Sequence, residues 1–149
     1  MDPNLSVGTL RELWQQSNES HWLPVCGTSM LPLLREGDRI LVSHELSEVK
    51  QGDILVFQRE EGLVAHRVVR ITRSPVEGRI YQTKGDNCAN FDSPLSAAEV
   101  LGVVNLVSRD GKEYDLTTLR WRLPNSLLAT IHLLVGTLFH VFRNTKHQL

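Results

Sequence analysis

Cysteine is scarce in this sequence, and the usual N-terminal signs of export or membrane anchoring are missing. Cys26 and Cys88 are the two cysteines among 149 residues, and two cysteines do not make a disulfide framework. The N-terminus has no basic stretch followed by an apolar run, so we expect neither a cleavable signal nor an N-terminal anchor. Repeats and low-complexity tracts are also missing. With 41% hydrophobic and 22% charged residues, the composition excludes an intrinsically disordered chain.

Acidic residues are missing from the last part of the chain. Residues 1–115 contain 12 Lys and Arg against 17 Asp and Glu, a net charge of −5. The remaining residues contain four basic side chains and no acidic one, a net charge of +4: Arg120, Arg122, Arg143 and Lys146. An acidic body with a basic, apolar tail favours an anionic membrane surface over nucleic acid as a partner. We therefore expect no nucleic-acid partner.

Short runs rich in Val and Ile, bounded by Gly, Asp, Asn and Pro, fill the middle of the sequence and predict β-strands. They are residues 39–43 (RILVS), 53–58 (DILVFQ), 63–72 (LVAHRVVRIT), 79–83 (RIYQT) and 100–109 (VLGVVNLVSR). The dipeptide Asp110-Gly111 joins the last run to residues 113–116 and predicts a hairpin. Many short strands with few helices predict a mainly β fold, a small antiparallel or barrel-like domain.

The two ends of the chain predict helices beside this β domain. Residues 1–22 are polar with a few apolar positions, and predict a short N-terminal helix. The uncharged segment 123–142 repeats apolar residues at helical spacing and predicts an amphipathic C-terminal helix. We therefore divide the chain into an N-terminal helix (1–22), a β domain (23–119) and a basic-flanked C-terminal helix (120–149).

The apolar stripe of the predicted C-terminal helix needs a partner. Segment 123–142 has about the length of a membrane span, but its Pro, Asn, Ser, Thr and His residues make it a poor one. A helix lying in the membrane interface, with basic flanks and Trp121 at its edge, fits better and predicts a peripheral membrane protein. The alternatives are that the stripe packs on the β domain or on a second copy in a homodimer, and that the protein is cytoplasmic.

Four sequence blocks occur in order along the β domain. They are residues 27–32 (GTSMLP), 52–56 (GDILV), 66–68 (HRV) and 85–92 (GDNCANFD). In the first block Ser29 is expected in a turn before a strand, which suits exposure of a hydroxyl. In the third block, strand alternation places His66 and Arg67 on opposite faces. A single Ser or His of this kind is usually structural, so the combination of the four blocks carries the signal.

The four blocks resemble those of the signal peptidase I family, over roughly residues 25–107. In order, they are similar to the family's nucleophile box, its G-D-I/V-V strand, its general-base strand and its G-D-N…D box. Bacterial members usually carry Lys at the base position, whereas the endoplasmic-reticulum and archaeal type carries His before Arg-Val. His66 therefore resembles the base of the Ser-His subtype. The resemblance implies a serine endopeptidase that cleaves a signal peptide, a leader peptide or a small precursor next to small residues.

The resemblance assigns a role to each candidate residue. Ser29 is the nucleophile, His66 the general base and Asp92 the carboxylate that orients His66. Asp86 is the second candidate for that carboxylate and is otherwise expected to be a supporting or structural residue. A Ser hydroxyl needs an adjacent base, and an imidazole can take its proton and return it to the leaving amine. A carboxylate on the other ring nitrogen fixes the tautomer of the imidazole. This chemistry uses no cofactor and no metal.

The oxyanion site departs from the family pattern. The family often places a Ser two positions before the nucleophile, where its hydroxyl helps to bind the oxyanion. Here that position is Gly27, and Thr28 follows it. The backbone N–H of Ser29 remains as a donor, with Thr28 as a supporting candidate. Because loss of one oxyanion donor costs about 10²-fold in rate, we expect a slow enzyme or another donor.

Other functions remain alternatives. Self-cleaving repressor-like proteases share the fold but typically use a Lys base, and residues 1–22 are too short for their DNA-binding domain. A non-catalytic peptide-binding domain on the same fold is the second alternative. A metal site made from Cys26, His66 and Cys88 lacks ligand spacing such as C-x-x-C. We expect two free thiols, with a disulfide between the cysteines as the alternative.

Overall fold

The computed structural model describes residues 9, 12–14, 19–59 and 62–145. The N-terminal helix was expected over residues 1–22, and most of that range lies outside the described residues. Residues 9 and 12–14 are helical, whereas His21–Pro24 form strand β1, so His21 and Trp22 belong to the sheet. The sheet therefore begins slightly before the expected boundary at residue 23.

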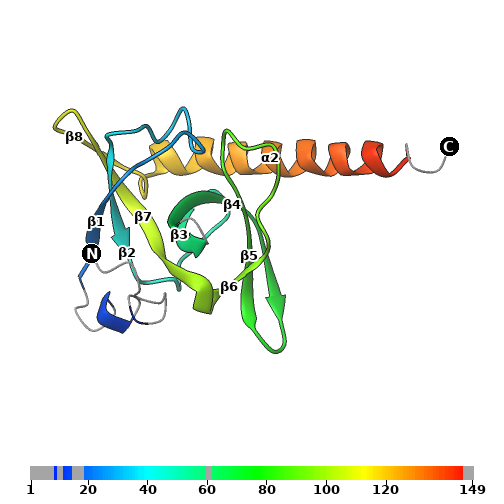
Figure 1. The fold of residues 1–149 in the computed structure, drawn as a ribbon, viewed down its shortest axis with the longest axis horizontal. Helices are drawn as coiled ribbons and strands as arrows, with labels where there is room; N and C mark the ends of the chain where they lie inside the picture. Colours follow the sequence, from blue (N-terminus) through cyan, green and yellow to red (C-terminus); the bar gives the residue numbers. More distant parts are fainter. Residues whose placement is uncertain (1–8, 10–11, 15–18, 60–61, 146–149) are drawn as a thin grey trace.

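The described chain folds into one antiparallel sheet with a long C-terminal helix (Figure 1). The strands are β1 His21–Pro24, β2 Arg39–Ser43, β3 Ile54–Arg59, β4 Gly62–Ser74, β5 Gly78–Lys84, β6 Leu95–Ser96, β7 Val100–Arg109 and β8 Lys112–Asp115. A 3₁₀ turn, η1, covers Ala97–Glu99, and helix α2 covers Leu119–Thr145. The strand order is β1-β2-β7-β3-β4-β5-β6, with β8 paired to β7. The mainly β fold is confirmed, and the sheet stays open, with edges at β1 and β6.

Two clusters of buried apolar side chains lie against this sheet. One cluster is built around β2 and β7, and the other around β3, β4 and β5. Met30 and Leu34 belong to the first cluster although they lie in the turn before β2, and they are only 3% and 1% exposed. Burial of such a side chain contributes about 1.5–3 kcal/mol. The core therefore anchors the turn that carries Ser29.

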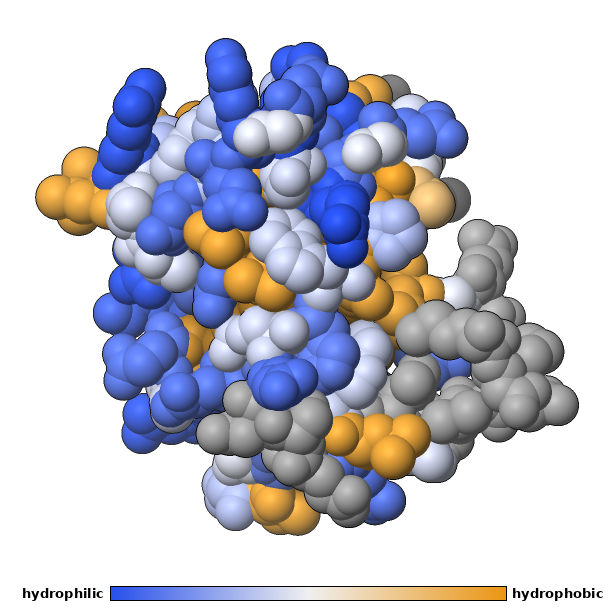
Figure 2. Space-filling model, turned by 90° about the vertical axis from the view of Figure 1, so that its left-hand side faces the viewer, coloured by the Kyte–Doolittle hydropathy of each residue, from blue (hydrophilic) through white to orange (hydrophobic). Residues whose placement is uncertain are grey.

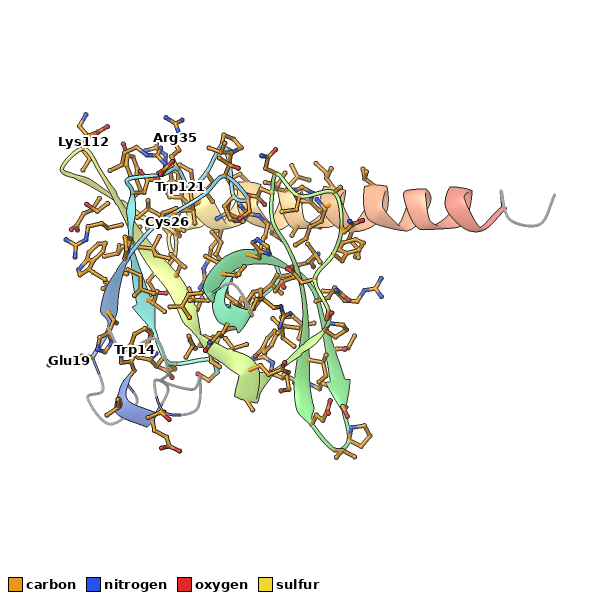
Figure 3. The ribbon with its side chains drawn as sticks, in the orientation of Figure 1. Trp14, Glu19, Cys26, Arg35, Lys112 and Trp121 are labelled. Carbon is orange, nitrogen blue, oxygen red and sulfur yellow. The ribbon has the colours of Figure 1, made fainter. Side chains whose placement is uncertain are left out.

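Trp14 belongs to the first cluster and Trp121 packs against it, and Figure 3 shows Trp14 in the lower part of the view and Trp121 near the top. Trp14 is buried and stacks on His21 of β1, with ring centroids 4.8 Å apart. Trp121 lies at the start of α2 and meets Tyr114 of β8 edge to face at 6.2 Å. The start of α2 is thereby tied to the sheet. Figure 2 shows the side on which β1 and β8 lie, and its side chains are mostly hydrophilic.

Helix α2 turns a narrow face of small and polar side chains towards the β domain. Asn125 and Ala129 are buried on this face. A Cβ atom added to Gly52 would lie 2.7 Å from the backbone nitrogen of Ser126, so the loop before β3 touches the helix backbone. The C-terminal part of α2 extends past the sheet (Figure 1).

The apolar stripe of α2 points away from the β domain. Large apolar side chains of α2 that are 45–71% exposed are Leu119, Leu123, Leu127, Ile131, Leu134 and Val135, whereas Leu128 of the predicted stripe is partly buried. The alternative in which this stripe packs on the β domain is therefore wrong for the exposed residues. Small and polar residues cover the contact because the surface beneath them carries buried charges, described below. Among the described residues, no helix has the length and apolar character needed to cross a membrane.

Candidate active site

Ser29 lies in a series of turns between β1 and β2. Hydrogen bonds within this segment join the N–H of Leu31 to the carbonyl of Thr28 at 3.2 Å, and the N–H of Leu34 to the carbonyl of Met30 at 3.0 Å. Ser29 itself is partly exposed, whereas Met30 beside it is buried. The turn therefore holds its backbone by core packing and presents Ser29 near the surface, as the sequence predicted.

A buried ion pair supports the end of this turn. Arg109 at the end of β7 donates to both carboxylate oxygens of Asp38, at 2.8 and 2.5 Å, and to the carbonyl of Leu33 at 2.7 Å. Asp38 also accepts the N–H of Arg35 at 2.9 Å. The hydrogen bond from Arg109 is the main reason that the pKa of Asp38 lies below its ordinary value. The segment after Ser29 is thus tied to the sheet by charge as well as by packing.

His66 lies in the middle of β4, opposite Leu55 of β3, and is only 8% exposed. Its Nδ1 atom is 2.8 Å from Oδ2 of Asp92. An ionised carboxylate only accepts hydrogen bonds, so Nδ1 carries the proton and Nε2 is the free acceptor. The ring of Phe57 meets the imidazole edge to face, with centroids 6.0 Å apart. The contact with Asp92 therefore fixes the orientation of the His66 ring.

Asp92 is held by β5 as well as by His66. The hydroxyl of Thr83 donates to Oδ2 of Asp92 at 2.7 Å, and the N–H of Asp92 donates to the carbonyl of Thr83 at 2.9 Å. The side-chain amide of Gln82 donates to the carbonyl of Asp92. Burial works to raise the pKa of Asp92, but the hydrogen bonds from His66 and Thr83 outweigh it and keep the pKa below its ordinary value. Asp92 is thus a carboxylate at neutral pH.

The loop after β5 connects Ser29 to His66. The N–H of Asn87 donates to the carbonyl of Ser29 at 2.8 Å, and its side-chain amide donates to the carbonyl of Thr28 at 3.2 Å. A Cβ atom at Gly85 would lie 2.8 Å from the Ser29 carbonyl and 2.9 Å from Nε2 of His66. The three segments therefore meet at one point.

The backbone carbonyl of Ser29 and the imidazole of His66 both lie beside Gly85. No hydrogen bond joins the side chains of Ser29 and His66 within the described part of the chain. Catalytic hydrogen bonds are often long without substrate and tighten when it binds. The arrangement places Nε2 of His66 beside the turn that contains Ser29.

Asp86 has a different partner from Asp92. Both of its carboxylate oxygens accept from Arg67, at 2.7 and 2.6 Å, and the third guanidinium nitrogen of Arg67 donates to the carbonyl of Gly52 at 2.9 Å. Arg67 is fully buried and the Asp86 side chain is 2% exposed. The N–H of Asp86 also points to the sulfur of Met30 at 3.4 Å. Asp86 therefore ties the loop to β4 and to the nucleophile turn.

Gly27 and Thr28 lie on the exposed side of the nucleophile turn. Gly27 has a φ angle of +86°, a conformation that side chains disfavour by roughly 1–2 kcal/mol. No atom outside its immediate neighbours lies within 4 Å of a Cβ built there, so conformation and not space favours glycine. The positive φ angle thus explains why position 27 is Gly and not the Ser of the signal peptidase pattern.

The two cysteines are free thiols, as expected. Cys26 is exposed, whereas Cys88 is partly buried with its sulfur beside Gly85. The described residues contain no group of three or more His, Cys, Asp or Glu side chains placed to hold a metal ion.

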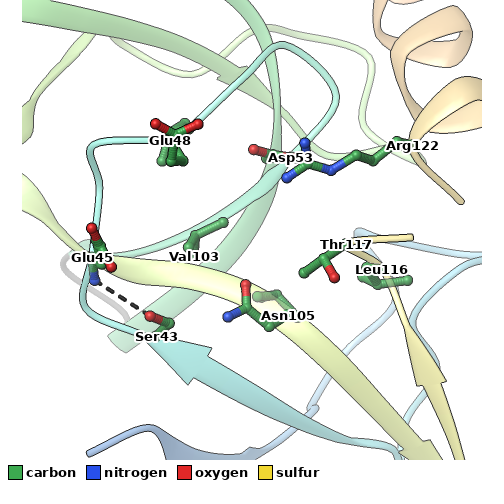
Figure 4. Close-up of a pocket in the computed structure, with 11 residues that line it drawn as sticks. Ser43, Glu45, Glu48, Asp53, Val103, Asn105, Leu116, Thr117 and Arg122 are labelled. Carbon is green, nitrogen blue, oxygen red and sulfur yellow. Dashed lines mark hydrogen bonds between the residues drawn. The ribbon is translucent and has the colours of Figure 1, made fainter. Parts of the chain in front are cut away.

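A small cavity of about 190 Å³ lies apart from these residues (Figure 4). It is bounded by the loop between β2 and β3, by β7 and by the start of α2, and its lining does not include Ser29, His66 or Asp92. Asp53 and Arg122 face each other in it (Figure 4). Burial raises the pKa of Asp53 above its ordinary value. We assign this cavity no part in the site.

Several residues of the site were not identified from the sequence. They are Thr83, Lys84, Arg109 and His132, together with Arg67 as the partner of Asp86. From the sequence alone, an Arg or Lys that is buried in a strand cannot be distinguished from one that lies on the surface. For Arg67, strand alternation indicated that its side chain lies on the face opposite His66. Its partner Asp86 is 19 residues away in the sequence, so the pairing was not predicted.

Two comparisons with known proteins give matches to this chain. The Peptidase S24-like family matches residues 5–89, which is more than half of the chain. The chain belongs to the Peptidase S24-like family, and this membership with the fold supports a serine peptidase. The chain is also 36% identical over 80 residues to signal peptidase I W of Bacillus subtilis (strain 168). That alignment covers 51% of this chain and 42% of the relative, so it spans less than half of that protein.

Proposed function

We propose that this protein is a serine endopeptidase of signal peptidase I type that works by a Ser-His-Asp mechanism. Ser29 is its nucleophile, His66 its general base and Asp92 the carboxylate that orients the base. The observation that carries the proposal is the 2.8 Å hydrogen bond between Nδ1 of His66 and Asp92, on a loop that also binds the backbone of Ser29. The similarity to signal peptidase I W supports the type of peptidase.

The residues supply each proton that the reaction moves. Nε2 of His66 takes the proton of the Ser29 hydroxyl as its oxygen forms a bond to the substrate carbonyl carbon. When the carbon–nitrogen bond breaks, the imidazolium returns this proton to the leaving amine. Water then attacks the acyl-enzyme with the same base. Asp92 stabilises the imidazolium without taking its proton. The N–H of Ser29 is the candidate oxyanion donor, supported by Thr28.

The substrate in this proposal is an extended signal peptide, leader peptide or small precursor with small residues beside the cleaved bond. A self-cleaving repressor-like protease is the second candidate, which the match to the Peptidase S24-like family leaves open. The two differ in the base, because the repressor-like proteases typically use Lys. His66, with Asp92 on its other ring nitrogen, favours the first candidate.

The experiment is cleavage of a peptide library that carries small residues, with labelling by a serine-reactive phosphonate. We expect Ser29→Ala and His66→Ala to lower turnover by at least about 10³-fold. Asp92→Asn leaves a folded protein in which the imidazole adopts the wrong tautomer, and should cost up to about 10⁴-fold. Thermal melting establishes that the variants are folded. A folded Ser29→Ala protein with wild-type turnover would exclude the mechanism.

We also propose that α2 binds an anionic membrane surface through its exposed apolar stripe, which would make the protein peripheral to a membrane. The stripe is unpartnered within the described residues, and Arg120 beside it is exposed. The tail from residue 116 onward carries a net charge of +4. Apolar area together with attraction to anionic lipids is what holds an amphipathic helix in the interface. A homodimer through the same stripe is the competing outcome.

A further inference from the structure

Helix α2 touches the loop that carries Asp86 and Asp92. Nζ of Lys84, at the end of β5, lies 3.0 Å from Nδ1 of His132 on α2. Nε2 of the same imidazole lies 3.5 Å from Oδ1 of Asp86. Four residues further along the helix, the ring of Phe91 lies directly over Gly136. The side chains of this loop therefore meet α2 on one side, while its backbone binds the Ser29 turn on the other.

The contact between Lys84 and His132 is buried, so the Lys84 ammonium needs hydrogen-bond acceptors from the protein. Lys84 is 7% exposed, and the side chains of His132 and Asp86 are 15% and 2% exposed. The carbonyl of Gly85 is a second acceptor for the Lys84 ammonium, at 3.4 Å. An ammonium group without acceptors costs several kcal/mol when buried. His132 is thus the better placed acceptor for this charge.

The neighbours of His132 decide its tautomer. An ammonium group only donates hydrogen bonds, so Nδ1 of His132 must accept and the proton lies on Nε2, facing Asp86. Burial, followed by the positive charge of Lys84, lowers the pKa of His132, and Asp86 opposes this shift while Arg67 adds to it. The imidazole is therefore neutral at neutral pH. Its Nδ1 contacts the Lys84 ammonium, whereas its Nε2, 3.5 Å from Asp86, has no hydrogen-bond partner among the described residues.

We infer that His132 is a positioning residue for catalysis: through Lys84 and Asp86, helix α2 sets the distance between Ser29 and His66. This inference rests on the proposed function. The path is short. The N–H of Asn87 donates to the carbonyl of Ser29, and the N–H of Asp86 points to the sulfur of Met30. Gly85 lies between the Ser29 carbonyl and His66. A loop that shifts towards or away from α2 moves the nucleophile relative to its base.

The test replaces His132 in the full chain. His132→Leu keeps a side chain of similar size but removes both hydrogen-bonding atoms. His132→Asn keeps an acceptor near the position of Nδ1. Thr130→Ala is the matched control, because it removes another α2 contact, the 3.5 Å bond from Gln51, and leaves Lys84 alone. Melting temperature, kcat, KM and the rate of phosphonate labelling are measured for each.

We expect His132→Leu to lower kcat and the labelling rate by about 10–10²-fold with KM little changed, because misplacement of about 1 Å costs that much. His132→Asn should recover most of the loss, and Thr130→Ala should match the wild type. Two results would overturn the inference: wild-type kcat in a folded His132→Leu protein, or an Asn variant that is folded and as slow as the Leu variant. Failure of the proposed function itself would show differently, as a wild-type protein that neither cleaves nor labels.

Discussion

Gly85 is the residue around which the candidate site is assembled. Its φ angle lies outside the range that favours glycine, so space and not conformation explains the residue. A Cβ atom there would lie 2.6 Å from the sulfur of Cys88, 2.8 Å from the carbonyl of Ser29 and 2.9 Å from Nε2 of His66. Contacts this short force the neighbours apart. The absence of a side chain at Gly85 thus allows the turn that contains Ser29 to approach His66.

Gly85→Ala should therefore damage catalysis more than folding. We expect kcat to fall by about 10²-fold, because the added methyl group pushes the Ser29 backbone away from His66. The melting temperature should fall by only a few degrees, since overpacking costs about 1–3 kcal/mol. Ala89→Ser, an exposed substitution in the same loop, is the control. Wild-type kcat in Gly85→Ala would show that the site tolerates a wider separation.

At the scale of elements, α2 has two faces with different surroundings. The face made of Asn125, Ala129, His132 and Gly136 meets the β domain, and it is small and polar. The opposite face carries the apolar stripe and is exposed. This is the reverse of the usual amphipathic helix, which buries its apolar face in its own domain. An exposed apolar stripe of this length marks an interaction surface.

The stripe can be tested without truncating the chain. Leu123, Leu127 and Leu134 are 60–65% exposed, so changing them to Ser should leave the fold intact. We expect the wild type to sediment with vesicles rich in anionic lipid, and the triple variant to bind at least about tenfold more weakly, since a buried Leu contributes about 1.5–3 kcal/mol. Val76→Ser, at the 92% exposed tip between β4 and β5, is the control.

Two results would contradict the membrane proposal. Equal sedimentation of the wild type and the triple variant would remove the stripe as the anchor. A wild type that ignores vesicles but forms a dimer, which the triple variant loses, would assign the stripe to a second copy of the chain.

At the scale of the whole molecule, four buried groups have pKa values below their ordinary values, and three of them, besides Asp38, lie around the candidate site. The pKa of Asp92 lies below 3.8, that of Lys84 below 10.5 and that of His132 below 6.5, their ordinary values. In each case the unfolded chain binds a proton at a pH where the folded protein does not. Stability therefore rises with pH between the lowered and the ordinary pKa of each group.

The shift at His132 predicts a loss of stability on mild acidification. The free energy of unfolding should fall as the pH drops below about 6.5, because the unfolded chain protonates this imidazole before the folded protein does. Lys84, Arg67 and Asp86 are the charged groups facing it, and the two cations oppose a positive charge on the imidazole. His132→Asn should flatten this slope in urea unfolding between about pH 5 and 7. A slope unchanged in the Asn variant would assign it to other groups.

The strands could be predicted from the sequence because their signals are local. Runs of Val and Ile end at turn residues, and the last long run coincides with β7, Val100–Arg109. The short β1 was missed because HWLP lies at the end of a segment that reads as a helix. The order of the four blocks named the candidates Ser29, His66 and Asp92. Their sequence separations left the distances between them undetermined.

Only the tertiary structure determined which carboxylates pair with His66 and Arg67, and which face of α2 is buried. Strand alternation places His66 and Arg67 on opposite faces, but the loop after β5 alone determines that one meets Asp92 and the other Asp86. Helical spacing defines the two faces of α2 without saying which one is buried. The polar face is buried because Lys84 and Asp86 lie beneath it and need partners, and because Gly136 leaves room for Phe91. Desolvated charges and space between distant segments are properties of the folded chain, and no local pattern records them.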